Sequence, residues 1–152
     1  MIDLLQLAMR SLPHGPEFRF VDRLLSLTPG VEGVGEYRVR GDEYYLRGHL
    51  PGEPILPGVL LVESAAQVAG IVAQEDPANP SMPRLKLTAL RAVKILGPVR
   101  PGQTLRIEAA ITGRLGALIQ AEVSAYIANN RVLSAELTLS GEPAPTGKSP
   151  GP

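Results

Sequence analysis

Two side chains that can exchange protons flank a loop rich in proline and glycine. His49 stands just before this loop in the segment GHLPGEPILPGVLLVESAAQ, and Glu63 lies within the apolar run that follows. A histidine can be neutral near pH 7 and so can serve as a base. A carboxyl group kept out of water tends to hold its proton, as a general acid must. The pair therefore indicates acid–base chemistry at a site built from the loop and the apolar run.

The apolar run has the spacing of one long helix, from Val59 to about Gln74, which EDPANPSMP ends. It contains no lysine or arginine, whereas a helix with one face in water usually shows a charged stripe. Its polar residues Glu63, Gln67 and Gln74 fall on one narrow stripe, with Ser64 beside them. We therefore expect the helix to be covered on most sides, with a carboxylate that has no cation within helical reach.

Each of the two groups also has an interpretation without chemistry. The polar stripe can be the solvent face of a narrow amphipathic helix, with Glu63 there for solubility, and helical periodicity alone favours neither interpretation. A lone histidine more commonly caps a turn and bonds to backbone, which would be the role of His49. The combination of a base, a stiff loop and a buried acid favours the catalytic interpretation.

The remaining segments predict a sheet around this helix. Apolar residues alternate with polar ones after residue 104, which is typical of half-buried strands joined as antiparallel hairpins. We expect a short helix at 2–12, strands at 18–27, 34–41, 105–111, 119–127 and 133–139, and one or two more strands within 84–96. The fold class is therefore α+β, with one long central helix wrapped by a curved antiparallel sheet of about six strands. A single domain over 1–141 and a mobile C-terminal tail over 142–152 are expected.

Composition excludes several classes of protein. The 152 residues carry 15 basic and 15 acidic side chains, and this balance argues against a nucleic-acid binder. The absence of cysteine rules out disulfides and thiolate metal sites. No apolar run reaches the roughly 20 residues of a membrane span, so we expect a cytoplasmic protein that does not enter the membrane. Without a glycine-rich phosphate loop or a cluster of metal ligands, we expect no cofactor and no metal.

The segment GHLPGEPILPGVLLVESAAQVAG resembles the active-site segment of the 3-hydroxyacyl-[acyl-carrier-protein] dehydratases of type II fatty acid synthesis. LPHGPEFRFVDR and VKILGPVRPGQ resemble two further segments of that family, so the likeness covers most of the chain. Leu50 stands where the family usually has phenylalanine, Gly15 replaces an arginine and Gln103 replaces an aspartate. None of these departures touches the proposed chemical groups.

The resemblance implies a hot-dog fold and a homodimer with two composite sites, often assembled further into a hexamer as a trimer of dimers. Each site would pair His49 of one protomer with Glu63 of the other. By position, the Gly58 backbone amide would hold the thioester carbonyl, and Gln67 would orient the acid. A glutamate at the acid position favours plain dehydration over combined dehydration and isomerisation. His14, the second histidine, is interpreted as a structural turn residue.

The implied reaction converts a (3R)-3-hydroxyacyl thioester on acyl carrier protein into the trans-2-enoyl thioester, in fatty acid biosynthesis. His49 would take the C2 proton and Glu63 would give a proton to the departing hydroxyl. Two other hypotheses remain open at this stage. One is a hot-dog acyl thioesterase, because the fold alone does not choose between reactions. The other is a non-catalytic hot-dog protein that binds acyl chains or serves in an assembly.

Positive charge is concentrated in one stretch of this neutral chain. No acidic residue occurs between Asp76 and Glu108, whereas several arginines and lysines do. Alternate strand positions can simply carry solvated cations, which accounts for some of them. An acidic carrier would give the rest a function, since opposite fields speed encounter. We expect the residues that dock the carrier to be among Arg84, Lys86, Arg91 and Lys94.

Overall fold

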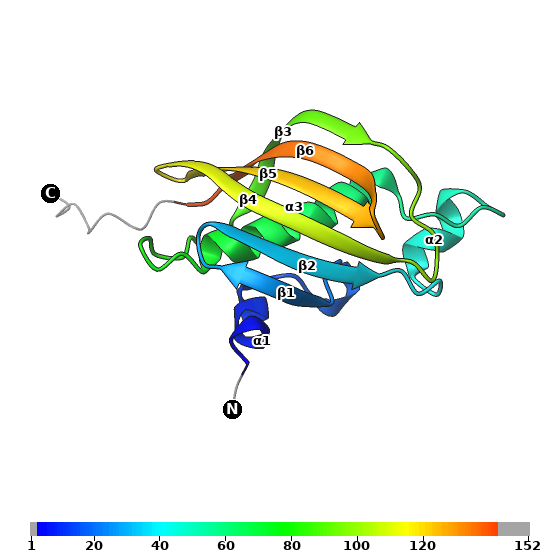
Figure 1. Cartoon of the computed structure of the whole chain (residues 1–152), viewed down its shortest axis with the longest axis horizontal. Helices are drawn as coiled ribbons and strands as arrows, with labels where there is room; N and C mark the ends of the chain where they lie inside the picture. Colours follow the sequence, from blue (N-terminus) through cyan, green and yellow to red (C-terminus); the bar gives the residue numbers. More distant parts are fainter. Residues whose placement is uncertain (1–2, 143–152) are drawn as a thin grey trace, which may run out of the picture.

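A six-stranded antiparallel sheet wraps around one long helix in the computed structural model, which describes residues 3–142 (Figure 1). The sheet order is β1-β2-β4-β5-β6-β3. The elements are α1 (Leu4–Ala8), η1 (Met9–Ser11), η2 (Pro16–Phe18), β1 (Arg23–Thr28), β2 (Glu32–Arg38), α2 (Tyr44–His49), α3 (Gly58–Gln74), β3 (Lys86–Ile95), β4 (Thr104–Leu115), β5 (Leu118–Ile127) and β6 (Asn130–Ser140), where η marks a 3-10 helix. The predicted hot-dog architecture is confirmed. Of the predicted tail, only residue 142 lies within the described residues.

The second half of the chain forms the predicted hairpins. Strands β4, β5 and β6 pair in succession, and their inward positions are buried while the intervening ones are more exposed. Ile107 and Ile119, for example, are fully buried. Strand β3 precedes these three in the chain but pairs with β6 at the far edge, so the chain crosses over from α3 to the edge opposite β1.

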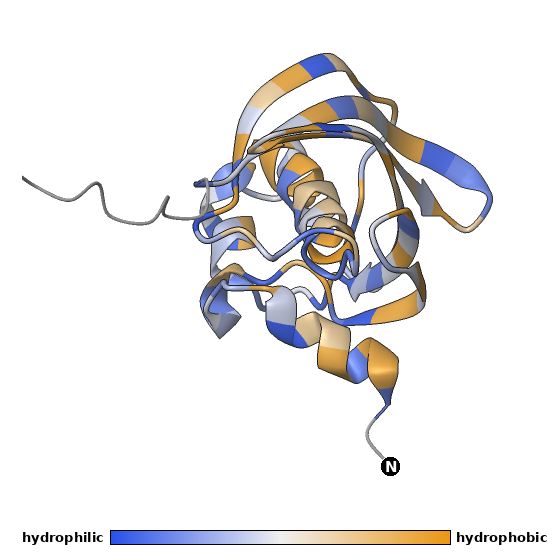
Figure 2. Ribbon diagram, turned by 90° about the vertical axis from the view of Figure 1, so that its left-hand side faces the viewer, coloured by the Kyte–Doolittle hydropathy of each residue, from blue (hydrophilic) through white to orange (hydrophobic). Residues whose placement is uncertain are grey.

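Helix α3 lies in the hollow of the curved sheet, as Figure 2 shows along its axis. Val68 and Val72 are fully buried there. Glycines on β2 allow the close approach, because a Cβ atom at Gly33 would lie 2.8 Å from Val72, and one at Gly35 would lie 2.9 Å from Val68. The expectation of a helix covered on most sides is therefore confirmed. None of the described helices has the length and apolar character needed to cross a membrane.

The first strand begins later than the sequence pattern predicts. The apolar alternation indicates a strand from residue 18, but β1 begins at Arg23. The backbone of Phe18 and Phe20 bonds to side chains of α3 instead of to a neighbouring strand. Because helix side chains satisfy these backbone groups, the segment runs across the helix and joins the sheet only afterwards.

Helix α2 is an element that the sequence pattern did not predict. Its Leu46 is buried, and Tyr45 shares a hydrogen bond between hydroxyl groups with Tyr37 of β2. Burial, followed by this hydrogen bond, raises the pKa of Tyr45, so the hydroxyl stays neutral. Glu43, just before the helix, accepts the backbone N–H groups of Arg40 and Gly41. These tertiary contacts stabilise a helix too short to form alone.

The turn before β4 keeps its shape despite the departure at Gln103. The Gln103 side chain accepts the backbone N–H of Arg100 at 2.7 Å, closing the turn as an aspartate could. Its backbone carbonyl accepts the N–H of Val39 at 3.1 Å. The substitution therefore leaves the turn with a side-chain hydrogen bond.

Candidate functional site

Three of the four polar side chains on α3 form hydrogen bonds with the backbone of neighbouring segments. Ser64 donates to the carbonyl of Phe20 at 2.6 Å, and Gln67 accepts the N–H of Phe20 at 2.9 Å. Gln74 bonds both backbone groups of Met82. Ser64 and Gln67 are 0% and 2% exposed, so the stripe is not a solvent face. The amphipathic interpretation of this helix is therefore wrong.

Glu63 differs from these residues because its contacts are with other side chains. Its Oε1 lies 3.2 Å from His14 Nε2 and 3.2 Å from Gln67 Nε2. The Glu63 side chain is 21% exposed. The sequence predicted an isolated buried carboxylate, since helical reach offers no cation. That prediction is wrong in both respects: the side chain is partly exposed, and tertiary structure brings His14 to it.

Glu63 and His14 border a cavity of about 400 Å³ between α3, the N-terminal segment and the start of β3. Most of its wall is apolar and comes from Leu12, Pro13, Ala66, Gly70, Ile71, Leu85, Leu87 and Leu139. The polar lining consists of Ser11, His14, Glu63, Gln67, Gln74 and Lys86. An apolar cavity with few polar groups, one of them a carboxyl, suits a ligand with an aliphatic chain and one reactive polar end.

His14 belongs to this site and is more than the structural turn residue that the sequence suggested. Its Nε2 contacts Glu63, while its Nδ1 is buried and has no hydrogen-bond partner among residues 3–142. The ring stacks on Phe18 at 6.0 Å between centroids, and its backbone carbonyl accepts from Arg19 Nε at 2.7 Å. The family-like segment LPHGPEFRFVDR contains His14 and was the signal in the sequence that could have identified it. The local pattern could not show that the His14 side chain contacts Glu63.

His49 is the last residue of α2, and its side chain is exposed. It has no side-chain hydrogen bond or ion pair within the described part of the chain, and it does not line the cavity beside Glu63. One chain by itself therefore does not bring the predicted base to the predicted acid. The composite site stays a prediction about two chains.

Gly58 is the first residue of α3, where the first backbone N–H groups have no partner within the helix. A Cβ atom at this position would lie 2.7 Å from Ile95 Cδ1 at the end of β3, so any larger residue would have to displace the end of that side chain. Ile95 and Gly58 also border a smaller apolar pocket of about 280 Å³ with Leu56 and Leu96. The predicted carbonyl-binding amide thus lies where the helix N-terminus meets the edge strand.

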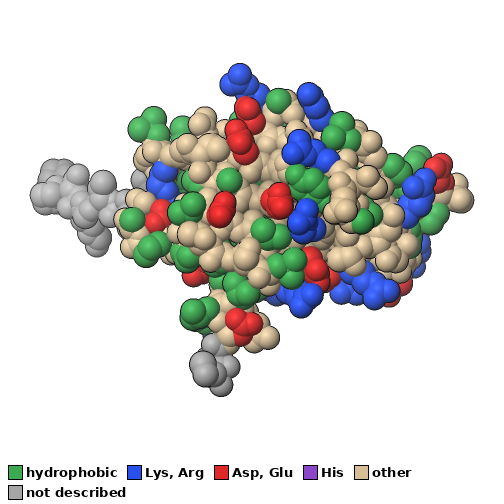
Figure 3. Space-filling view, viewed as in Figure 1, with side chains coloured by type: hydrophobic (Ala, Val, Ile, Leu, Met, Phe, Trp, Pro, Cys, Tyr) green, Lys and Arg blue, Asp and Glu red, His purple; other side chains and the backbone are tan. Residues whose placement is uncertain are grey.

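The basic residues predicted to dock a carrier are exposed on and beside β3. Arg84 forms an ion pair with Glu142 at 3.3 Å, and Arg91 forms one with Glu136 at 3.5 Å. Lys86 and Lys94 form no ion pair within residues 3–142. Blue side chains project along the upper rim of the molecule, over β3, in Figure 3.

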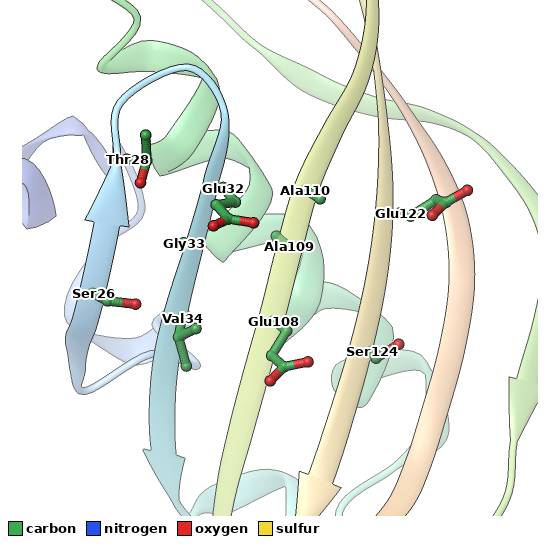
Figure 4. Close-up of a pocket in the computed structure, with 10 residues that line it drawn as sticks. All are labelled: Ser26, Thr28, Glu32, Gly33, Val34, Glu108, Ala109, Ala110, Glu122 and Ser124. Atoms are coloured by element: carbon green, nitrogen blue, oxygen red, sulfur yellow. The ribbon is translucent and has the colours of Figure 1, made fainter.

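A second hollow of about 410 Å³ lies on the outer face of the sheet, across β1, β2, β4 and β5 (Figure 4). Glu32, Glu108 and Glu122 project into it from the face opposite α3. It contains none of the predicted site residues. In the described part of the chain, no group of three histidine or carboxylate side chains could hold a metal ion.

Comparison with known proteins identifies the group to which this fold and sequence belong. The FabA-like domain family matches residues 12–136. The chain is 37% identical over 134 residues to the 3-hydroxyacyl-[acyl-carrier-protein] dehydratase FabZ of Chloroflexus aggregans, covering 88% of this chain and 92% of that protein. It is 44% identical over 108 residues to the FabZ dehydratase of Geobacter metallireducens, covering 69% and 71%.

Among solved structures, a chain of the dehydratase heterocomplex ApeI:P from Xenorhabdus doucetiae superposes with a TM-score of 0.74 at 17% identity, covering 89% of this chain and 90% of that one. The HP0420 homologue from Helicobacter felis has a TM-score of 0.68 at 14% identity, covering 93% of each chain. At such identities these structures support the fold alone. The sequence relatives carry the assignment further: this chain belongs to the FabA-like family, among the 3-hydroxyacyl-[acyl-carrier-protein] dehydratases.

Proposed function

We propose that this protein is a hydro-lyase that removes water from (3R)-3-hydroxyacyl-[acyl-carrier-protein] to form trans-2-enoyl-[acyl-carrier-protein], in cytoplasmic fatty acid biosynthesis. The observation that carries the proposal is Glu63, the one carboxyl group among the described residues that line a cavity whose wall is mostly apolar, in a chain whose relatives are such dehydratases. The acyl chain would occupy the cavity, with its 3-hydroxyl group toward Glu63.

In the proposed mechanism, His49 removes a proton from C2, which the thioester carbonyl makes acidic. The electron pair forms the C2–C3 double bond as the C3–O bond breaks, and Glu63 gives its proton to the departing oxygen, so that water leaves. The backbone amide of Gly58, at the positive end of α3, stabilises the charge that develops on the carbonyl oxygen. Each acid or base role typically contributes about 10²–10⁴-fold to the rate.

A second copy of the chain would complete this site. Within residues 3–142, strand β3 is an edge strand whose outward backbone groups have no neighbouring strand, and Leu90, Val93 and Ile95 are 49%, 37% and 52% exposed on it. An exposed apolar edge is a template for pairing with another strand. We propose a homodimer joined along β3, with His49 of one protomer beside Glu63 of the other, and a hexamer built from three such dimers.

The proposal is tested by incubating the protein with 3-hydroxyacyl and enoyl thioesters while following enoyl absorbance and free thiol. Interconversion is the expected result. Release of thiol would identify a thioesterase instead, and neither signal would identify a non-catalytic acyl-binding protein.

The residue roles are tested with His49→Ala and Glu63→Gln. Each is expected to reduce dehydration by about 10²-fold or more in a folded protein. Glu108→Gln, which alters a carboxyl group on the outer face of the sheet, is the matched control and should keep full activity. Mixing the two inactive variants under conditions of subunit exchange should restore part of the activity. Wild-type turnover by either single variant would remove that residue from the mechanism.

A further inference from the structure

We propose that His14 is a positioning residue for Glu63: it holds one oxygen of the carboxyl group and so reserves the other for proton transfer to the substrate. The inference rests on the proposed function, in which Glu63 is the acid. It concerns a residue of the same chain as Glu63, whereas the proposed base comes from the partner.

Two side-chain nitrogens converge on one oxygen of Glu63, that of Gln67 through a hydrogen bond and that of His14 through a close contact. His14 Nε2 and Gln67 Nε2 each lie 3.2 Å from Oε1, and Oε2 has no hydrogen bond within residues 3–142. A carboxyl oxygen that accepts two N–H groups is the poorer place for a proton. When Glu63 is protonated, the proton therefore resides on Oε2. The two donors thereby fix which oxygen can deliver it.

The surroundings of the His14 ring determine which of its nitrogens carries hydrogen. Nδ1 is buried and has no partner among residues 3–142, so a hydrogen on Nδ1 would be buried without an acceptor. With its hydrogen on Nε2 instead, the ring would direct that N–H toward Glu63 Oε1, 3.2 Å away. In this proposal His14 acts on Glu63 by donation from Nε2.

Contacts on both sides hold the His14 ring in place. Arg19 Nε donates to the His14 carbonyl at 2.7 Å, and the ring stacks on Phe18. Gln67, the other donor to Glu63, also donates to the carbonyl of Phe18 at 2.9 Å. The same glutamine thus ties the segment that carries His14 to the helix that carries Glu63. This shared anchor gives the two donors a fixed geometry around Oε1.

The test compares His14→Ala with His14→Gln, whose side-chain amide can still donate to Glu63. His14→Ala should lower kcat on the order of 10²-fold with little change in KM, because the acid is mispositioned while the substrate cavity remains. His14→Gln should recover most of that loss, since donation and not titration is required. Ser64→Ala, which removes the hydrogen bond to the Phe20 carbonyl and leaves His14 and its contact with Glu63 in place, is the structural control and should keep kcat.

Three kinetic results would overturn the proposal: wild-type kcat for a folded His14→Ala protein, no recovery with His14→Gln, or an equal loss with Ser64→Ala. If His14→Ala does not fold, the tautomer measurement that follows still decides. A second measurement is independent of activity. Nitrogen-15 NMR of the imidazole at pH about 8 should show hydrogen on Nε2 and none on Nδ1. The opposite tautomer would refute His14 as the donor even if the protein is a dehydratase. Conversely, a protein without dehydratase activity could still show the expected tautomer, so the two proposals can fail separately.

Discussion

At the scale of single residues, the polar side chains of α3 perform two kinds of task. Ser64 and Gln67 satisfy backbone groups of the segment that crosses the helix, and Glu63 faces a cavity with side chains as its only partners. Gln67 takes part in both tasks, because its amide reaches Phe18, Phe20 and Glu63. A residue predicted only to orient the acid is thus also part of what holds the fold together.

Because Gln67 has both tasks, we expect Gln67→Ala to destabilise the protein strongly. The variant leaves the buried N–H of Phe20 without its partner and removes a bond from the Phe18 carbonyl, so we expect a loss of about 2–3 kcal/mol in the free energy of unfolding. Ser64→Ala removes one hydrogen bond and should cost about 1 kcal/mol. Urea denaturation of both variants measures the difference. Equal stabilities would show that the Gln67 amide does not anchor the segment.

At the scale of elements, one face of α3 forms a wall of the cavity. The lining positions Glu63, Gln67, Gly70 and Gln74 follow helical spacing over about 16 Å of helix axis. Gly70 lies between the carboxyl end and the Gln74 end of this wall. A Cβ atom there would meet only Leu85 Cδ2, at 4.0 Å, so the position has room for a small side chain and borders open space.

This space predicts that residue 70 limits the length of the acyl chain. Gly70→Leu should fill the cavity and lower kcat/KM for long-chain substrates by roughly 10-fold or more, while short-chain substrates keep theirs. Gly70→Ala is the matched control: it should leave chain-length preference unchanged and stabilise the helix by about 1 kcal/mol. Kinetics across a series of chain lengths, with thermal melts, measure both. A uniform loss at every length would show that the acyl chain does not pass residue 70.

At the scale of the whole molecule, a neutral chain separates its charges. Carboxylates at Glu32, Glu108 and Glu122 occupy the outer face of the sheet, whereas Arg84, Lys86, Arg91 and Lys94 lie on or beside the β3 edge. Figure 3 shows red side chains in the middle of this face with blue ones among them, and further blue ones along the upper rim. An acidic carrier would be attracted to the basic side chains of β3, near the opening at Lys86.

We therefore propose that the basic side chains on and beside β3, and not its backbone edge, dock the carrier, and we test this by charge reversal. Arg91→Glu should raise KM for a carrier-linked substrate roughly fivefold or more at low salt, and should barely affect a short thioester without the carrier. Arg23→Glu is a matched control on the opposite edge, because Arg23 and Arg91 each pair with one glutamate, Glu36 and Glu136. Equal changes in KM for the two variants, or salt-independent turnover, would refute docking at β3.

The sequence by itself determined the elements whose signal is local. The apolar spacing of Val59 to Gln74 and the alternation after residue 104 predicted α3 and the strands β4 to β6, because period and composition depend only on near neighbours. The lack of lysine and arginine in the helix predicted its burial. The segment around His49, Gly58 and Glu63 identified the family, which the relatives confirm.

Only the tertiary structure decided which distant segments meet. The contact of His14 with Glu63, the late start of β1 and the existence of α2 each depend on side chains that lie far apart in the sequence. No local period encodes such contacts, since they arise when the whole core packs and backbone groups find partners on other elements. For this reason the sequence predicted a lone buried acid at residue 63, whereas the fold places nitrogens of His14 and Gln67 each 3.2 Å from one of its oxygens.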